Sequence, residues 1–276
     1  MSPLKRKEFL KIRVYSFVVL AVLLIVISLL APYLAPNNPN TTNSAIMNIA
    51  PSAEYPCGTD RLGRCVCSRV IMGAQTSILS AIGLVAVSFL IGSVFGMLCG
   101  YYGGAIDNII MRLADVLLAF PQMVLAIAVA GILGGGLLNA LIALGITAWT
   151  LYARLARSHT MSIKNEPFIA AAKLSGCSDF TILFRHILPN IVGSLLVNAT
   201  TQIGTTMIGI AGLSFLGLGV IPPNAEWGSM INEARSYIQL APWTVLAPAI
   251  AMVVTIMIFN YLGDSVRDLA DVSGVI

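Results

Sequence analysis

Cysteine thiols are the most reactive side chains that this sequence groups together. Cys57, Cys65 and Cys67 lie within one short polar segment, whereas Cys99 and Cys177 are far from it in the sequence. Thiolates are soft ligands that bind transition metals, so the three residues are candidates for holding a metal in transit. They could instead form a disulfide in an oxidising compartment, or remain free thiols. The sequence leaves these three alternatives open.

Other patterns that support catalysis or nucleotide binding are missing from the sequence. His159 and His186 do not have the spacing of metal ligands. No Gly-x-x-x-x-Gly-Lys-Ser/Thr loop is present, so the chain is not expected to bind ATP in the usual way. Ser214 follows Gly212 in a Gly-x-Ser pattern, but Leu216 stands where a nucleophile elbow needs glycine. We therefore predict that the chain is not an enzyme, has no catalytic residues and binds no cofactor of its own.

A group of small polar residues interrupts an otherwise apolar stretch late in the chain. Their spacings of three and four residues put several of them on one face of a helix. Such a face could line a pore, and small polar residues also serve as contacts between membrane helices. Both interpretations are kept for Asn198, Thr201, Gln202, Thr205 and Thr206.

Arg112 and Asp115 are charged residues three positions apart at the edge of another apolar stretch. An unpaired charge at the centre of a bilayer costs about 2.5–3.5 kcal/mol. Residues at this spacing are neighbours on a helix, so we interpret the two as an ion pair that anchors the helix at the membrane surface. Pro121, further along the same stretch, is expected to kink the helix.

The composition predicts that these residues are carried by membrane helices. The 276 residues are 57% hydrophobic and only 10% charged, with a mean hydropathy of +0.88. A typical soluble domain has roughly 25% charged residues, and so apolar a chain could not cover a surface that faces water. The small net charge of +4 does not indicate a nucleic-acid partner. We expect an all-α membrane protein whose solvent is the lipid bilayer.

Six apolar stretches are long enough to cross a hydrocarbon layer about 30 Å thick. The first could be mistaken for a signal peptide, but it has about 20 residues and no clear cleavage site follows it, so we expect it to be retained. The predicted spans are Val14–Leu34, Ser77–Gly100, Leu113–Leu133, Leu137–Leu155, Ile191–Leu216 and Trp243–Leu262.

The distribution of basic residues predicts how the spans are oriented. With the N-terminus inside, only Arg61, Arg64, Arg69 and Arg235 of the 16 Lys and Arg residues fall outside, as the positive-inside rule favours. Both termini are then cytoplasmic. The predicted parts are a cytoplasmic tail (1–13), a first helix (14–34), a mostly irregular external segment (35–76), a five-helix core (77–264) with a cytoplasmic loop at 158–190, and a cytoplasmic tail (265–276).

The segment from Phe168 to Asn190 is a mildly basic, helix-compatible insertion between two apolar spans. Ala171, Ala172 and Gly176 fall at helical spacing and leave one side with little bulk, so another protein's backbone could approach closely. Gly176 can end the helix because glycine accepts left-handed dihedral angles, and Pro189 is suited to begin the next span. The segment could also be an ordinary helix lying on the membrane surface.

This segment resembles the cytoplasmic EAA loop of permease subunits in binding-protein-dependent ABC importers. The family pattern is Glu-Ala-Ala, three residues, Gly and later Leu-Pro; here Ala170 stands at the glutamate position. The resemblance implies a type I importer permease with six transmembrane helices and a cytoplasmic coupling (EAA) helix that docks into an ATPase subunit. The residues implied to couple to the ATPase are Phe168, Ala171, Ala172, Gly176, Asp179, Leu188 and Pro189.

Further stretches resemble the dipeptide, oligopeptide and nickel branch of the family, in order from about Gly58 to Asp268. Two polar stretches on the external side could together meet a substrate donor, and their candidate residues are Asp60, Arg64, Glu226 and Trp227. The stretches that carry the likeness are 58–60, 63–64, 68–69, 112–115, 119–121, 149–154, 213–219, 226–228, 260–264 and 267–268.

The resemblance implies the pore subunit of an ATP-driven importer in the cytoplasmic (inner) membrane of a prokaryote. Its implied partners are a homologous second permease, two ABC ATPases that use ATP and Mg, and an extracytoplasmic substrate-binding protein. Residues 173–176 and 225–235 look closer to nickel-type members, so we predict import of nickel or a nickel chelate, with di- or oligopeptides as the alternative. An alternative of another class is a stand-alone secondary transporter or channel.

Overall fold

The computed structural model describes residues 3–273, with side chains from 7 to 270. Within these residues the regular elements are helices. One isolated antiparallel bridge pairs Thr59 with Cys65. Five of the described helices are long and apolar enough to cross a membrane, or six if a bent pair counts as one span. The prediction of an all-α membrane fold is confirmed. The ends of both predicted tails, residues 1–2 and 274–276, lie outside the described part.

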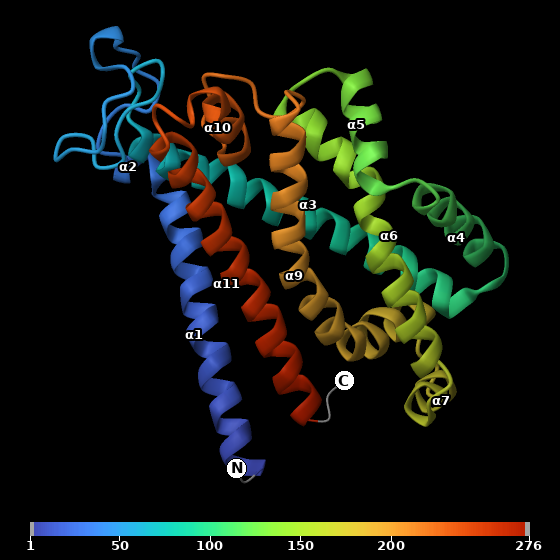
Figure 1. The fold of residues 1–276 in the computed structure, drawn as a ribbon. Helices are drawn as coiled ribbons and strands as arrows, with labels where there is room; N and C mark the ends of the chain where they lie inside the picture. The colour runs from blue at the N-terminus through green and yellow to red at the C-terminus, as the bar shows by residue number, and fades with distance from the viewer. Residues whose placement is uncertain (1–2, 274–276) are drawn as a thin grey trace.

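Three long helices stand in a row, with α11 (Trp243–Ser273) packed between α1 (Pro3–Leu29) and α9 (Leu188–Phe215) (Figure 1). Phe17 of α1 stacks on Tyr261 of α11 with ring centroids 5.5 Å apart, and Arg13 lies 3.4 Å from Asp268. Helices α1 and α11 extend through most of the predicted tails. The start of α1 and the end of α11 therefore lie at one end of the molecule, the lower end in Figure 1.

The tightest helix pair in the fold is α3 (Val66–Tyr102) against α6 (Leu137–Ile163). Gly92, Gly96 and Gly100 of α3 face α6, and a Cβ on Gly96 would lie only 2.3 Å from the carbonyl oxygen of Ala153. Glycines at four-residue intervals let two membrane helices approach backbone to backbone. With 37 residues, α3 is roughly 55 Å long. It begins at Val66, so the predicted external segment is irregular only as far as Cys65.

The predicted third span, Leu113–Leu133, is not one helix. Helix α4 (Gly104–Leu118) and helix α5 (Gln122–Leu133) meet at an angle of 88°, and Pro121 lies at the start of α5. The expected kink at Pro121 is thus a full break. Helix α4 lies along the outer side of α6, held by Asp107, whose carboxylate pairs with Arg157 of α6 (Oδ2 to Nη2, 2.6 Å).

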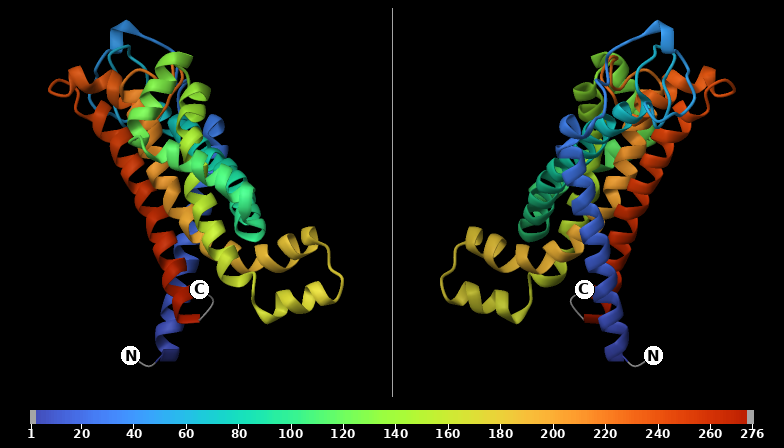
Figure 2. Two further views of the ribbon diagram at one scale, coloured as in Figure 1. Left: turned by 90° about the vertical axis from the view of Figure 1, so that its right-hand side faces the viewer. Right: turned by 90° about the vertical axis from the view of Figure 1, so that its left-hand side faces the viewer.

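The predicted loop 158–190 forms a projecting segment, which we define as residues 164–187. It contains α7 (Pro167–Leu174), α8 (Asp179–Thr181) and the π-helical stretch η2 (Ile182–Ile187), which continues without a break into α9. Pro189 therefore lies in the first turn of α9, as predicted for the start of this span, although the helical stretch itself begins earlier, at Asp179. A proline ring clashes with the carbonyl four residues earlier, and a π-helical turn relieves that clash. Figure 2 shows this segment standing out to one side at the lower end.

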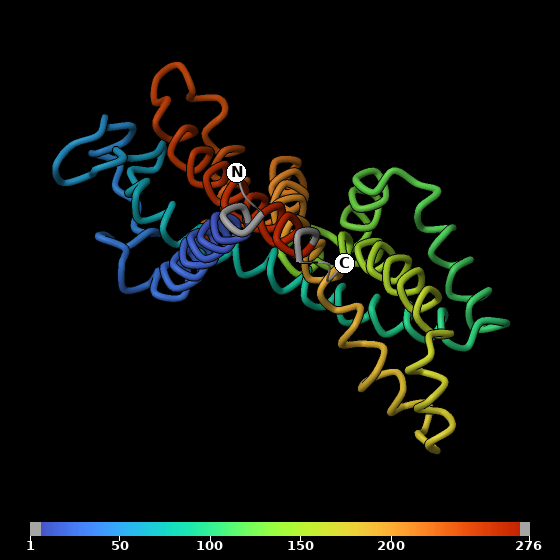
Figure 3. The backbone as a smooth tube through the Cα atoms, turned by 90° about the horizontal axis from the view of Figure 1, so that it is seen from below, coloured from blue at the N-terminus to red at the C-terminus, as the bar shows by residue number. Residues whose placement is uncertain are grey.

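The opposite, upper end is capped by residues 35–65, which follow the short α2 (Ala31–Leu34) and contain η1 (Ser44–Ile46), and by α10 (Trp227–Ala234) with η3 (Arg235–Tyr237). Trp227 anchors α10 on α3, since its indole nitrogen donates to the carbonyl of Val70 at 2.9 Å. The main apolar core lies between α3, α6, α9, α10 and α11, and a second, smaller core lies beneath the projecting segment. Seen from below, the projecting segment lies well to one side of α1 and α11 (Figure 3).

Candidate functional site

The projecting segment has one buried face and one exposed apolar face. Ile169 of α7 is buried in the small core beside Ile182 and Ile187 of η2. On the outer side, Leu174 is 91% exposed and Phe180 is 70% exposed, so their apolar surface has no cover within the described chain. Exposed apolar side chains on a short, well-anchored helix are typical of a surface that a partner protein covers.

The small residues predicted to share one side of α7 are divided between its two faces. Ala171 is exposed, whereas Ala172 is buried against the small core. Gly176 lies just beyond the end of α7 with φ = +78° and open space around its Cα. The prediction that Gly176 ends the helix agrees with this conformation. The prediction of a single smooth side of small residues is wrong, because residues 171 and 172 are about 100° apart around a helix.

A polar contact joins the projecting segment to the lower end of α3. The hydroxyl of Tyr101 donates to Asp179 Oδ1 at 2.6 Å, and the ammonium of Lys173 lies 5.2 Å from the centre of the Tyr101 ring. Asp179, predicted as a coupling residue, thus holds α8 to α3. Phe168 is exposed on α7, while Leu188 and Pro189 lie at the first turn of α9. Movement of this segment would therefore be passed to both α3 and α9.

A cavity of about 370 Å³ lies between α3, α5, α6 and α9. Its polar lining comes from Gln202, Thr205 and Thr206 of α9 and from Gln122 at the start of α5. Leu84, Met123 and Leu144 contribute apolar wall. Amide and hydroxyl groups can each donate and accept hydrogen bonds, so the cavity is suited to a polar, hydrogen-bonding guest.

The polar residues predicted to share one face of the fifth span have different surroundings in the structure. Gln202, Thr205 and Thr206 line the cavity, but Thr201 packs against Gly263 of α11, where an added Cβ would lie 2.5 Å from its methyl group. Asn198 donates to the backbone carbonyl of Ser194 at 2.9 Å and is not among the residues that line this cavity. The packing interpretation therefore describes Thr201, whereas pore lining stays a prediction for Gln202, Thr205 and Thr206, which face the cavity.

Gln122 and Met123 are cavity residues that the sequence analysis missed. The sequence signal that could have identified them was Pro121, because a proline between two apolar stretches often places the residues after it at the start of a helix. The charged pair also differs from the prediction, since Asp115 bonds to Arg154 of α6 at 2.6 Å and the ion pair of Asp115 is not with its neighbour Arg112. This contact ties α4 to α6 from the exposed side.

A second cavity, of about 440 Å³, opens at the upper end between residues 39–40, α3, the start of α6 and residues 220–225. Asn40, Gln75, Thr76 and Asn224 supply its polar lining. The polar lining of both cavities therefore consists of uncharged side chains that can form hydrogen bonds.

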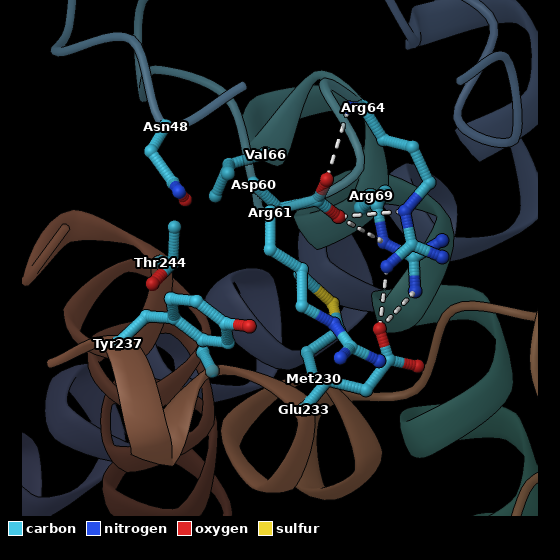
Figure 4. Close-up of a pocket in the computed structure, with 11 residues that line it drawn as sticks. Asn48, Asp60, Arg61, Arg64, Val66, Arg69, Met230, Glu233, Tyr237 and Thr244 are labelled. Carbon is cyan, nitrogen blue, oxygen red and sulfur yellow. Dashed lines mark hydrogen bonds and ion pairs between the residues drawn. The ribbon is translucent and has the colours of Figure 1, made fainter. Parts of the chain in front are cut away.

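The upper end also holds a cluster of two arginines and two carboxylates (Figure 4). The buried guanidinium of Arg64 bonds to Asp60 (Nε to Oδ2, 2.6 Å) and to Glu233 of α10. Arg69 is buried between the same carboxylates, at 3.8 and 3.9 Å, and donates to the carbonyl of Pro223 at 3.0 Å. The cluster therefore fastens the irregular segment and α10 to the start of α3.

Three of the four predicted external-face residues are buried. Glu226 is 1% exposed and Trp227 is 2% exposed. Glu226 caps α10, because its carboxylate oxygens accept from the backbone amides of Gly228 and Ser229, each at 2.8 Å. Arg64 is buried as well, and Asp60 is partly buried. These four residues therefore build the upper end from within, and other side chains form its outer surface.

Residues 92–271 match the family described as the binding-protein-dependent transport system inner membrane component. The chain belongs to this family. Relatives from Pectobacterium atrosepticum and Escherichia coli, both named glutathione transport system permease protein GsiD, are 45% and 44% identical to it. The matches span 90% and 91% of this chain and 83% of each relative. A chain of the MetNI methionine ABC transporter, solved in inward facing conformations, has a TM-score of 0.52, at 19% identity, over 71% of this chain and 94% of that one.

The permease is accordingly a multi-pass inner membrane subunit of a binding-protein-dependent ABC importer. An importer of this class works with an ATPase and a substrate-binding protein, and nucleotide binding belongs to the ATPase. The alternative of a stand-alone secondary transporter or channel is therefore wrong. The likeness to the methionine transporter, at 19% identity, shows a shared fold.

The arrangement of the cysteines bears on the alternative that they hold a metal in transit. Among the described residues there is no group of three or more His, Cys, Asp or Glu side chains placed to hold a metal ion. Cys57, Cys65 and Cys67 are all free thiols in the structure. The interpretation of these residues as ligands for a metal in transit is not supported by their arrangement.

Proposed function

We propose that the permease is the pore subunit of an importer for small peptides of the glutathione class. The observation that carries this is 45% identity along 90% of the chain to a permease named for glutathione transport. The preference for nickel rested on two short stretches, 173–176 and 225–235, and the relatives named here are not nickel permeases. The peptide alternative is therefore the better supported substrate.

The cavity between α3, α5, α6 and α9 has a chemistry that suits such a substrate. A peptide carries amide groups and carboxylates, which form hydrogen bonds with the side chains of Gln122, Gln202 and Thr205. The volume, about 370 Å³, lies in the range of roughly 300–1,000 Å³ that is usual for small-molecule sites. We infer that these residues line the translocation path.

We further infer that the lower end is cytoplasmic and that the projecting segment couples the permease to an ATPase. The exposed apolar side chains of Leu174 and Phe180 would be covered by the ATPase, which uses ATP and Mg. Because Asp179 and the small core join this segment to α3 and α9, a rotation of α7 would reach the cavity wall. A homologous second permease and a second ATPase complete the assembly, and both termini are cytoplasmic.

Uptake by vesicles that carry the complete transporter and its binding protein tests the proposed substrate. We expect ATP-dependent accumulation of labelled glutathione, competed by small peptides and unaffected by nickel. A control with an ATPase that cannot hydrolyse ATP should show no accumulation. Nickel uptake that peptides do not suppress, with no glutathione signal, would contradict the proposal and restore the metal alternative.

A further inference from the structure

The backbone brings two of the upper-end cysteines to the two ends of one short loop. Thr59 and Cys65 form an antiparallel bridge, flanked by the hydrogen bonds Asp60 N to Arg64 O at 3.0 Å and Val66 N to Gly58 O at 3.1 Å. These hydrogen bonds close a short loop from Gly58 to Val66, and Cys57 and Cys67 are the residues directly before and after it.

The loop closure brings the two cysteines near one another. The hydrogen bond from Val66 N to Gly58 O joins the residue after Cys57 to the residue before Cys67. Cys67 lies in the first turn of α3, so the start of the helix fixes the position of its backbone beside this closure. The thiols of Cys57 and Cys67 are close enough to interact electrostatically.

We propose that Cys57 and Cys67 form a disulfide in the mature permease. The inference rests on the proposed orientation, in which the upper end faces the oxidising side of the membrane, where disulfides persist. Cys65 is buried, and its backbone pairs with Thr59, which does not carry a thiol. Cys99 and Cys177 lie at the lower end and remain thiols.

The reaction is a thiol–disulfide exchange with an external oxidant, either a protein dithiol oxidoreductase in its disulfide form or a small-molecule disulfide. The thiolate of one cysteine attacks the oxidant's disulfide, forming a mixed disulfide and releasing one thiol. The second cysteine then attacks the mixed disulfide, and the S–S bond between Cys57 and Cys67 forms as the other thiol leaves. The two cysteines lose two protons and two electrons, which the oxidant takes up as two thiols.

The bond would close the short loop that presents Asp60 to Arg64 and Arg69. Asp60 is held by bonds to Arg64, and the same arginines hold Glu233 of α10. Fixing both ends of the loop limits how far Asp60 can move from the arginines. The disulfide would therefore stabilise the attachment of α10 and the irregular segment to α3, which is the surface that faces the substrate donor in the proposed orientation.

Peptide mapping of the complete transporter, purified without reductant after free thiols are alkylated, tests the bond directly. Trypsin cuts after Arg61, Arg64 and Arg69, so Cys57 and Cys67 fall in different peptides that stay joined only through a disulfide. Cys65 and Cys67 share one peptide, and the Cys65→Ser variant removes that ambiguity. We expect the joined peptide in the native chain and in Cys65→Ser, and its loss in Cys57→Ser and Cys67→Ser. Alkylated Cys57 and Cys67 in the unreduced chain would overturn the proposal.

Right-side-out vesicles separate this inference from the proposed orientation. A membrane-impermeant maleimide should label Cys57 and Cys67 only after treatment with an impermeant reductant. Labelling without reductant would overturn the disulfide and leave the orientation standing. Labelling of both residues only by a permeant maleimide would overturn the orientation, and the disulfide with it. Neither result depends on which substrate the transporter carries.

Thermal unfolding gives a second measurement. Cys57→Ser and Cys67→Ser should lower the Tm by the same amount, and the double variant should lower it no further, because both changes remove one bond. Reductant should lower the Tm of the native chain to the value of the variants and leave the double variant unchanged. Additive effects, or no response of the native chain to reductant, would contradict the disulfide.

Discussion

At the scale of single residues, Thr201 and Thr205 are the same residue type on the same helix with different surroundings. Thr205 lines the cavity, whereas Thr201 packs on Gly263 of α11. Thr205→Val removes a hydroxyl without changing shape, and the loss of one hydrogen bond, about 0.5–1.5 kcal/mol, predicts a roughly 2- to 10-fold increase in KM for peptide uptake. The matched change Thr201→Val should leave KM unchanged. Equal effects of the two variants would remove Thr205 from the translocation path.

Glu226 makes a second prediction at this scale. Its buried carboxylate accepts from two amides at the start of α10 and from the Ser77 hydroxyl of α3 at 3.2 Å. Glu226→Ala leaves these donors buried without an acceptor, which costs roughly 1–3 kcal/mol. We expect a lower Tm for the detergent-purified permease. Glu54→Ala, which removes an exposed carboxylate at the same end, is the control and should have little effect. An unchanged Tm for Glu226→Ala would show that the cap does not stabilise α10.

The sequence predicted the types of these residues better than their positions. A polar cluster in an apolar span is visible from composition and spacing, so Gln202 and Thr205 were found. Which face of the helix meets a cavity and which meets α11 depends on the neighbouring helices, and the spacing of one helix does not contain that information. Glu226 and Trp227 were read as exposed because polar and proline-rich surroundings usually are, yet their side chains turn inward to cap and anchor α10.

At the scale of helices, the contact of α3 with α6 depends on glycines. A Cβ on Gly96 would lie 2.3 Å from the carbonyl oxygen of Ala153, whereas a Cβ on Gly83 of the same helix would meet nothing within 4 Å. Gly96→Ala must push the helices apart, and overpacking of this kind costs about 1–3 kcal/mol. Gly83→Ala should be neutral or slightly stabilising, since alanine is the better helix former. The Tm of the two variants in detergent checks this. A Gly96→Ala protein as stable as Gly83→Ala would show that α3 and α6 are not closely packed.

Helix existence was predictable, and helix ends were less so. Hydropathy marks the apolar part of a helix, so the spans were found, but α3 begins at Val66 and α6 ends at Ile163 because turns that contain polar residues continue both helices beyond their apolar parts. A proline can either break a helix or be accommodated within it, and the local sequence does not show which will occur. Pro121 lies where α4 turns away to bond with α6 through Asp107 and Asp115, so the chain breaks there. Pro189 lies in a continuous helix because a π-helical turn accommodates it.

At the scale of the whole molecule, the two ends are built in different ways. The upper end is fastened internally by the cluster of Arg64, Arg69, Asp60 and Glu233, and its key side chains are buried. The lower end instead presents apolar side chains on the projecting segment, whose anchors include Ile169 and Ala172 in the small core and the bond of Asp179 to Tyr101. An internally fastened upper end and a projecting lower segment are consistent with a permease that receives substrate at one end and is driven by an ATPase at the other.

The proposed ATPase contact gives the prediction that tests this division of tasks. Leu174 is almost fully exposed in the isolated chain, so Leu174→Ser should leave the Tm of the permease unchanged. If the ATPase covers Leu174, the change removes apolar burial of roughly 1.5–3 kcal/mol and weakens ATPase binding by roughly ten- to hundredfold. Leu240→Ser, at an exposed leucine of the upper end, is the matched control.

Co-purification of the ATPase with each variant, followed by titration of the ATPase against the purified permease, measures the effect. Loss of ATPase with Leu174→Ser and its retention with Leu240→Ser would assign the docking surface to the projecting segment. Full ATPase binding by Leu174→Ser would contradict docking at this face. Loss with Leu240→Ser alone would reverse the proposed orientation, because the ATPase would then bind the end that carries α10. Each outcome assigns ATPase binding to one end of the permease on the basis of a single leucine substitution.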